Sequence, residues 1–224
     1  MALLLLLLST VGSADFEKGY EAYKRKDYET ALREWRPLAE QGQALVQFNL
    51  GVMYYEGRGV PQDYTAAVKW YTLAAQQGYA MAQHNLGVMY SNSEGVPQDY
   101  TAAVKWYTRA AEQGEPAAQF NLALMYRDGE GVPQNDKTAV KWYRLSAEEG
   151  YAPAQFNLGL MYARGQGISQ NDVYAHMWLN ISASRGYKRA AEVRGLAAKV
   201  MTPAQLEKAQ ELAVECEKKK YKGC

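Results

Sequence analysis

Apolar and small residues recur along most of the chain at positions i, i+4, i+5 and i+8, which is the spacing of one helical face. In one segment these positions are Ala82, Leu86, Gly87 and Tyr90. A second stripe at helical spacing follows each time, after a loop that in most cases contains glycine and proline. The pattern predicts pairs of amphipathic helices, with first helices at about 44–56, 80–92, 116–128 and 152–164.

The helix pairs repeat at a fixed interval. Asn49, Asn85, Asn121 and Asn157 hold the same place in successive pairs and lie 36 residues apart each time. A fixed period in this range is typical of stacked helical solenoids, in which each unit buries its apolar face against its neighbours. We therefore predict an all-α fold built from side-by-side helical hairpins.

Loop and cap residues agree with this division. Gly57 suits the left-handed position that ends a helix, and Pro61 prevents the helix from continuing. Ser93 replaces that glycine in the next repeat, so we expect a weaker turn there. Glycine also recurs inside the first helices, which suggests close approach of the partner helix. The expected N-caps of the second helices are Asp63, Asp99, Asn135 and Asp172.

The repeated phrase resembles a known family. Ala-x-x-x-Leu-Gly-x-x-Tyr, a Gly-x-Gly-Val loop, then Asp, Ala, Trp and Ala-Ala-x-x-Gly are similar to Sel-one-like repeats, which are tetratricopeptide relatives with a longer loop inside the repeat. The resemblance is strong over residues 42–186 and looser over 15–41 and 187–217. It implies a right-handed superhelix of αα-hairpins that displays a concave groove to a protein or peptide.

Both ends of the array depart from the pattern, as expected of terminal units. Residues 15–41 form an atypical first unit with a shorter loop, like an ordinary tetratricopeptide hairpin, and residues 187–224 form a C-terminal cap and tail. Thr202 and Pro203 predict the start of a last helix. One apolar face is expected from Ala190, Val193, Leu196, Ala197 and Val200, and another from Leu206, Ala209, Leu212 and Ala213.

Residues 1–14 contain an unbroken leucine run at 3–8, with Gly12 and Ala14 as small residues before Asp15. The apolar stretch is well short of the roughly 20 residues that span a bilayer. We interpret it as a cleaved secretory signal, although no Lys or Arg precedes the leucines. The alternative is a retained, buried helix. With cleavage, the chain would be periplasmic or secreted, with no membrane insertion.

Cys216 and Cys224 are the two cysteines of the chain. In an oxidising compartment they would form a disulfide. Eight residues of continuous helix would separate their Cα atoms by about 12 Å, whereas a disulfide needs less than about 7 Å. The helix must therefore end near residues 218–220 and the tail must turn back, helped by Gly223. Two free or intermolecular thiols remain the alternative.

Charge and motifs give little sign of chemistry. A net charge of +1 offers no electrostatic reason to expect nucleic acid as a partner. His84 and His176 lie in different repeats without a metal-ligand pattern, so we predict no metal, no cofactor and no enzymatic activity. The rival hypothesis is a weak penicillin-binding or β-lactamase-like hydrolase, as suggested for cysteine-rich relatives. No Ser-x-x-Lys motif supports it.

A binding scaffold, expected to be a monomer, is the better hypothesis. On a helical wheel, one side of each first helix combines an asparagine with aromatic and aliphatic residues, which suits an extended peptide. By resemblance to tetratricopeptide units, this side lines the concave surface. The alternative is that these residues pack neighbouring helices together. The candidate residues are Phe48, Asn49, Val52, His84, Asn85, Val88, Phe120, Asn121, Leu124, Arg127, Phe156, Asn157 and Leu160.

Overall fold

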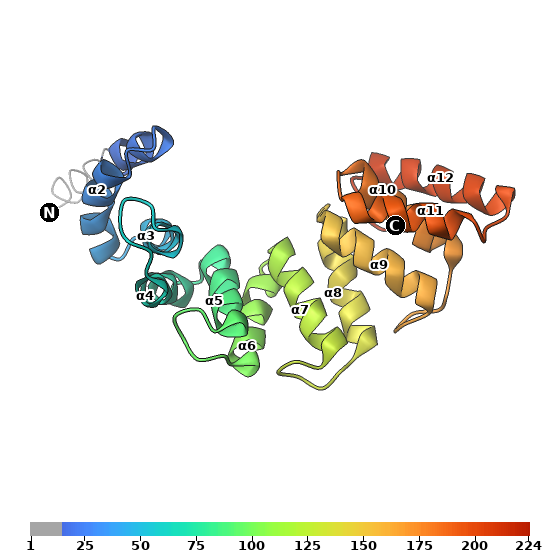
Figure 1. Ribbon diagram of the computed structural model, residues 1–224, viewed down its shortest axis with the longest axis horizontal. Helices are drawn as coiled ribbons and strands as arrows, with labels where there is room; N and C mark the ends of the chain where they lie inside the picture. The colour runs from blue at the N-terminus through green and yellow to red at the C-terminus, as the bar shows by residue number, and fades with distance from the viewer. Residues whose placement is uncertain (1–14) are drawn as a thin grey trace, which may run out of the picture. The chain divides into compact units, whose positions relative to one another are not determined.

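The computed structural model describes residues 15–224, so the predicted signal segment at 1–14 lies outside the described residues. The described part is helical, with connecting turns and no β-strand. A first helical segment covers residues 15–24. The helices that follow are α2 (Tyr28–Glu40), α3 (Ala44–Glu56), α4 (Tyr64–Gln76), α5 (Ala80–Asn92), α6 (Tyr100–Glu112), α7 (Pro116–Asp128), α8 (Asp136–Glu148), α9 (Ala152–Arg164), α10 (Asp172–Ser184), α11 (Lys188–Ala198) and α12 (Pro203–Lys218) (Figure 1).

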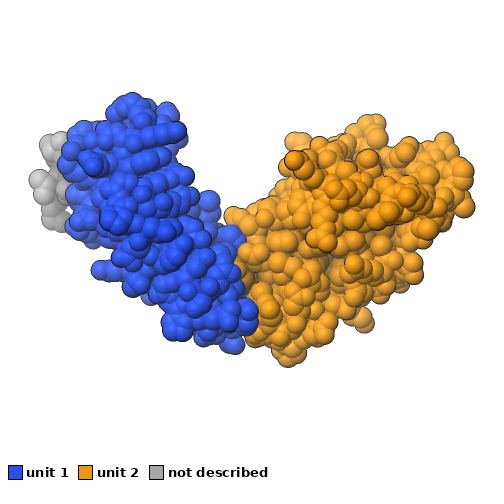
Figure 2. Space-filling model, viewed as in Figure 1, with its two compact units in different colours: residues 1–106 blue, residues 107–224 orange. Residues whose placement is uncertain are grey.

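The chain forms two compact units, which we call unit 1 (residues 1–106) and unit 2 (residues 107–224) (Figure 2). The boundary falls inside α6. In unit 1, α3 packs against α2 and α4, and α4 packs against α5. In unit 2, consecutive helices from α7 to α10 pack against each other in the same way. Within each unit, therefore, each hairpin covers the apolar face of the next, as the periodicity predicts.

Small helix residues let aromatic rings enter the core of unit 1. Tyr71 is 2% exposed, and a Cβ added at Gly51 would lie 2.5 Å from its ring. Trp35 takes the same place in the first hairpin, against Gly19. The expected close approach at these helix glycines is confirmed, and its cause is a ring on the partner helix. Methyl-sized residues at these positions would have to displace a buried aromatic side chain.

Loop glycines have a second role in docking one repeat onto the preceding one. Gly95 has φ +70°, and an added Cβ would lie 2.5 Å from the carbonyl group of Tyr64 at the start of α4. Gly167 approaches the carbonyl of Asp136 in the same way in unit 2. The Gly-x-Gly loop thus combines a left-handed backbone with close backbone packing, and glycine satisfies both demands.

Most of the expected caps are present. Asp63, Asp99 and Asn135 accept backbone hydrogen bonds as N-caps, but the cap of α10 is Asn171 rather than Asp172, which is the first helical residue. The side chain one position earlier reaches the free N–H of Tyr174, and this corrects the prediction. Ser93 adopts the left-handed conformation, with φ +61° and ψ 38°, where the other repeats have glycine.

The C-terminal end differs in part from expectation. Both α11 and α12 pack against α10. Ala209 and Ala213 of α12 are buried, as predicted, and Thr202 forms a capping box with Gln205. In α11, however, Ala190 is buried whereas Leu196 is 61% exposed, so the predicted apolar face is only partly covered. The sequence pattern identified an apolar face but could not show that α12 would pack against α10 and leave the outer half of that face exposed. Val200, beyond the end of α11, is likewise exposed.

None of the helices in residues 15–224 combines the length and the apolar character that crossing a bilayer requires.

Candidate functional site

The candidate residues on the first helices range from buried to partly exposed to solvent. Phe48 and Phe156 are 8% and 3% exposed and lie in apolar cores, against Tyr79 and Tyr187 respectively. The rings of these two tyrosines, at the N-caps of α5 and α11, cover the phenylalanines, so little of either phenylalanine side chain is left at the surface. The other candidates are half-buried, which leaves part of each side chain at the surface: Asn49, Val52, His84, Asn85, Val88, Phe120, Asn121, Leu124, Arg127, Asn157 and Leu160.

The asparagines contact buried tyrosines of the preceding repeat. The side chain of Asn85 lies beside the hydroxyl group of Tyr71. Burial raises the pKa of Tyr71 well above its usual range, and the side-chain amide of Asn85 opposes that rise. In unit 2, Asn157 lies beside the hydroxyl of Tyr143, whose pKa burial raises in the same way. Both hydroxyls therefore stay neutral, and each asparagine lies beside a buried tyrosine hydroxyl.

A cavity of about 240 Å³ lies in unit 1, beside this asparagine. Its wall consists of Tyr55 from α3, Tyr71 from α4, and four residues of α5: His84, Asn85, Val88 and Met89. Tyr71 and Met89 are buried and close its inner side, whereas the other four are half-buried. The cavity therefore reaches the surface along α5 and brings together three of the candidate residues, His84, Asn85 and Val88.

Tyr55, which forms part of the cavity wall, contacts two residues that do not line the cavity. The Tyr55 hydroxyl donates a hydrogen bond of 3.1 Å to the carboxylate of Glu94, and its ring packs 5.2 Å from that of Tyr64. Burial raises the pKa of Tyr55, and the hydrogen bond to Glu94 adds to the rise. These contacts hold the Tyr55 ring at the rim of the cavity.

Arg127 holds the place of Tyr55 two repeats later, in unit 2. Its guanidinium donates two hydrogen bonds of 2.7 Å to Asp128 and lies beside the hydroxyl of Tyr143. Neither Arg127 nor Asn157 makes a hydrogen bond of normal geometry to that hydroxyl. Arg127, predicted as a partner-binding residue, is thus already engaged by an adjacent carboxylate.

A ladder of glutamines was not predicted from the sequence. Gln47, Gln83, Gln119 and Gln155 are buried, and each side-chain amide donates to a carbonyl eight residues earlier, at 2.9–3.2 Å. The acceptors lie in the last turn of the preceding helix, where carbonyls lack helical partners. The recurrence of Gln directly before the aromatic position was the available signal. Its role is structural, since the amide joins consecutive hairpins.

The two cysteines form the predicted disulfide, with a Cα–Cα distance of 5.7 Å. Helix α12 ends at Lys218, and Lys220, Tyr221 and Gly223 have positive φ, so the tail turns back as the geometry requires. Tyr221 then accepts a hydrogen bond of 3.0 Å from Arg185. Lys222 pairs with Glu149 at 2.5 Å. The basic tail is therefore fastened to the turns that precede α9 and α11 in unit 2.

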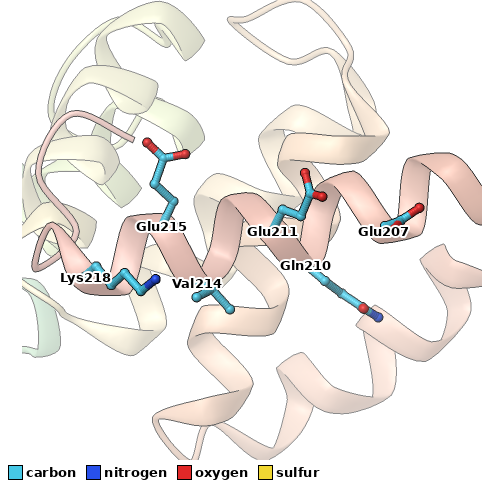
Figure 3. A pocket seen from close by; sticks show the side chains of 6 residues that line it. All are labelled: Glu207, Gln210, Glu211, Val214, Glu215 and Lys218. Atoms are coloured by element: carbon cyan, nitrogen blue, oxygen red, sulfur yellow. The ribbon is translucent and has the colours of Figure 1, made fainter.

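A wider hollow of about 450 Å³ runs along α12, and all six of its side chains project from that one helix (Figure 3). Four of them are charged, and Glu211 and Glu215 pair with Lys208 and Lys219. Val214 is 52% exposed. A solvated face of one helix provides no enclosed surface for a ligand, so this hollow is a weaker candidate than the cavity in unit 1.

The two histidines lie in different environments, His176 in a buried core and His84 in the wall of a cavity. His176 is 5% exposed in the core of unit 2, and burial lowers its pKa, with a smaller contribution from Arg194. His84 belongs to the wall of the cavity in unit 1. Across residues 15–224, no three His, Cys, Asp or Glu side chains are arranged so that they could hold a metal ion.

Comparisons with known proteins agree with the fold. A family model described as Sel1 repeat matches residues 44–79, 80–115, 116–151 and 152–187. Among solved structures, the chain resembles c5321, a protective antigen present in uropathogenic Escherichia coli strains that displays an SLR fold, with 33% identity and a TM-score of 0.80. The match covers 91% of this chain but only 46% of the antigen.

A Sel1 repeat protein from Oxalobacter formigenes matches with 33% identity and a TM-score of 0.78, over 90% of this chain and 84% of that one. The immunity protein Pa5087 from Pseudomonas aeruginosa, at 20% identity and a TM-score of 0.52, covers 93% of this chain and 83% of its own, and supports the fold alone. No curated protein matches. These findings confirm the predicted fold class and the resemblance on which it was based.

Proposed function

Because this chain belongs to the Sel1 repeat family, whose helical scaffold commonly serves protein interaction, we propose that it binds another protein or a peptide through its first helices. The observation that carries the proposal is the half-buried side of those helices, where asparagine amides beside buried tyrosines alternate with apolar side chains. Such a surface offers hydrogen bonds to a peptide backbone and contacts for its side chains.

Two features separate this surface from a purely structural one. The Gln ladder and the buried Phe48 and Phe156 already supply the packing between hairpins. Val52 and Leu124, by contrast, keep part of their surface open at the corresponding place of two repeats. Binding residues are commonly displayed in this way on a scaffold whose packing is satisfied by other residues.

Site-specific photocrosslinking tests the proposal. A photoreactive phenylalanine analogue at position 52 or 124 should crosslink the full chain to a partner in cells. The matched controls are Lys69 and Lys141, which are exposed on the second helices of the same repeats. Equal crosslinking from positions 52 and 69, or from 124 and 141, would show that the first-helix surface has no special role.

We further propose that the protein works in the periplasm or outside the cell, which rests on the leader-like residues 1–14 and on the disulfide. Fusion of residues 1–30 to alkaline phosphatase, which requires export for activity, is the test. An active fusion and a mature chain that begins at Asp15 are expected. An inactive fusion, with the full-length chain recovered reduced from the cytoplasm, contradicts this location.

A further inference from the structure

We propose that the cavity in unit 1 is a specificity pocket for one aromatic side chain of the bound protein or peptide. This inference rests on the proposed function and adds the chemistry of the residue that anchors the partner. The lining is formed by Tyr55, Tyr71, His84, Asn85, Val88 and Met89.

The volume and the lining define the occupant. About 240 Å³ is below the usual range of roughly 300–1,000 Å³ for pockets that take drug-sized ligands, and it suits a single large side chain. Tyr71 presents a buried ring, and Met89 presents a thioether, which makes favourable contacts with aromatic groups. No carboxylate lines the cavity, and the Glu94 carboxylate accepts a hydrogen bond from the hydroxyl of Tyr55. A cationic side chain would therefore lose its hydration without gaining a counter-ion.

The other repeats show what kind of group the lining positions normally carry. The residue corresponding to His84 is phenylalanine in each of the other three repeats: Phe48, Phe120 and Phe156. Those rings pack against the tyrosines of their own surroundings, with ring centroids 5.1–5.8 Å apart. The residue corresponding to Val88 is leucine in the two later repeats, at Leu124 and Leu160. The repeat at 80–115 thus carries a smaller ring than the other repeats at position 84 and a smaller side chain than the two later repeats at position 88, beside a cavity that an external ring can enter.

Asn85 provides the polar complement to this ring. Its amide has two donor hydrogens and an acceptor oxygen, and it lines the cavity beside the Tyr71 hydroxyl. This hydrogen-bonding capacity suits the backbone N–H or C=O of the residue whose side chain enters the cavity. The site would therefore recognise an aromatic side chain together with its own peptide group, as apolar pockets with a few placed polar groups commonly do.

The test uses N-acetyl-phenylalanine methylamide as a probe on the full mature chain with methyl-labelled valine and methionine. The Val88 and Met89 methyl signals should shift and saturate in the millimolar range, since a single side chain makes few contacts. The aspartate and arginine analogues of the probe should bind at least tenfold more weakly. A larger shift with the arginine analogue, or no saturable shift with the phenylalanine probe, would overturn the inference.

Matched variants locate the effect. H84F and V88L introduce residues that sister repeats already carry, so helicity and melting temperature should stay close to those of the parent. The double variant should lose at least tenfold in probe affinity. V200L makes the same change at a site that is 78% exposed, outside the cavity lining and the candidate surface, and should leave binding unaltered. If the double variant is misfolded, V88L alone serves, with an expected loss of at least threefold. If a correctly folded H84F/V88L or V88L variant binds the probe as tightly as the parent, the pocket inference is refuted.

Failure of the pocket and failure of the proposed function give different results. If positions 52 and 124 crosslink a partner but the probe does not bind, the pocket inference alone is wrong. If the probe binds as expected but crosslinking does not distinguish the first helices from the controls, the general binding surface is wrong.

Discussion

The junction around Tyr71 in unit 1 and the junction around Tyr143 in unit 2 follow one plan. At each, a glutamine at the start of the following first helix donates to the preceding helix, through Gln83 and Gln155. The core tyrosine is buried in both places, and an asparagine of the following helix lies at its hydroxyl. These shared contacts join one hairpin to the next.

The surroundings of the two tyrosines differ. Unit 1 has Tyr55 turned to Glu94, and a cavity lined by the small side chain of Val88. Unit 2 has Arg127 beside Tyr143, and Phe156 buried in the core. The comparison teaches that the residues repeated at both junctions hold the fold, whereas the residues that change between them give each junction its own surface. Exchanging residues between the two units tests this division.

The largest effect is expected where the junctions are identical. Leu86→Ala and Leu158→Ala each truncate a side chain with 0% exposure, so each should lower the free energy of unfolding by about 2–5 kcal/mol. Chemical denaturation followed by circular dichroism is the measurement. Leu145→Ala, at a site 38% exposed, is the control and should cost less than about 1 kcal/mol. A near-neutral result at either core leucine would contradict the assignment of helix faces.

Replacing a helix glycine by alanine should affect stability differently in the two units. Gly51→Ala places a methyl group 2.5 Å from the buried ring of Tyr71, so we expect a loss of about 1–3 kcal/mol. At the corresponding Gly159, an added methyl group would lie 3.0 Å from the Cγ of Leu179 and 3.1 Å from the carbonyl oxygen of Ala175, so both contacts are longer than the 2.5 Å at Gly51. Since alanine also gains about 1 kcal/mol in helix propensity, Gly159→Ala should change stability by less than about 1 kcal/mol. Thermal melts of the two variants provide the measurement. If both lose the same stability, the ring of Tyr71 does not make Gly51→Ala more destabilising.

A buried histidine distinguishes the last repeat from the one before it, where Val140 holds the same position as His176. Burial lowers the pKa of His176 in the folded state, and its Nδ1 has no hydrogen-bond partner. The unfolded chain therefore binds the proton more readily, so stability is lost as the pH falls below the ordinary value of about 6.5.

His176→Val should remove this acid sensitivity and raise the free energy of unfolding by about 1 kcal/mol at neutral pH, since an unpaired buried polar atom disappears. Melting temperatures of the parent and the variant across mildly acidic pH provide the measurement. The reciprocal Val140→His should introduce acid sensitivity one repeat earlier. A parallel pH dependence in the parent and His176→Val would assign the effect to other groups.

The sequence was sufficient for what depends on period and chain geometry. The interval between Asn49 and Asn157 led to the hairpin array, and the separation of Cys216 from Cys224 required the tail to turn back. The sequence was not sufficient to predict whether an apolar helix face is covered by another helix. The outer end of α11, with Leu196, has the pattern of a buried face but remains exposed, because the next helix, α12, packs against α10.

The candidate site was predictable only in part for the same reason. His84, Asn85 and Val88 were identified from the helical wheel, but the cavity beside them depends on where Tyr55 places its ring. The Tyr55 hydroxyl is hydrogen-bonded to Glu94, 39 residues away in the chain, and no local sequence pattern connects these two residues. The Gln ladder was missed because a long polar side chain is ordinarily assigned to the surface.

The smallest effect is expected at the helix ends. Ser93 and Gly129 occupy the same left-handed position, with φ +61° and +73°, one repeat apart. A residue with a Cβ is less stable in that conformation than glycine, so Ser93→Gly should stabilise by about 0.5–1 kcal/mol and Gly129→Ser should destabilise by a similar amount. Both positions are exposed and lie outside the candidate surface, so neither change should alter probe or partner binding. Opposite shifts in melting temperature with unchanged binding would show that turn stability and surface specificity vary independently between the two units. A loss of probe binding in Ser93→Gly would instead tie the cavity to the turn through Glu94, which directly follows this residue and holds Tyr55 at the rim.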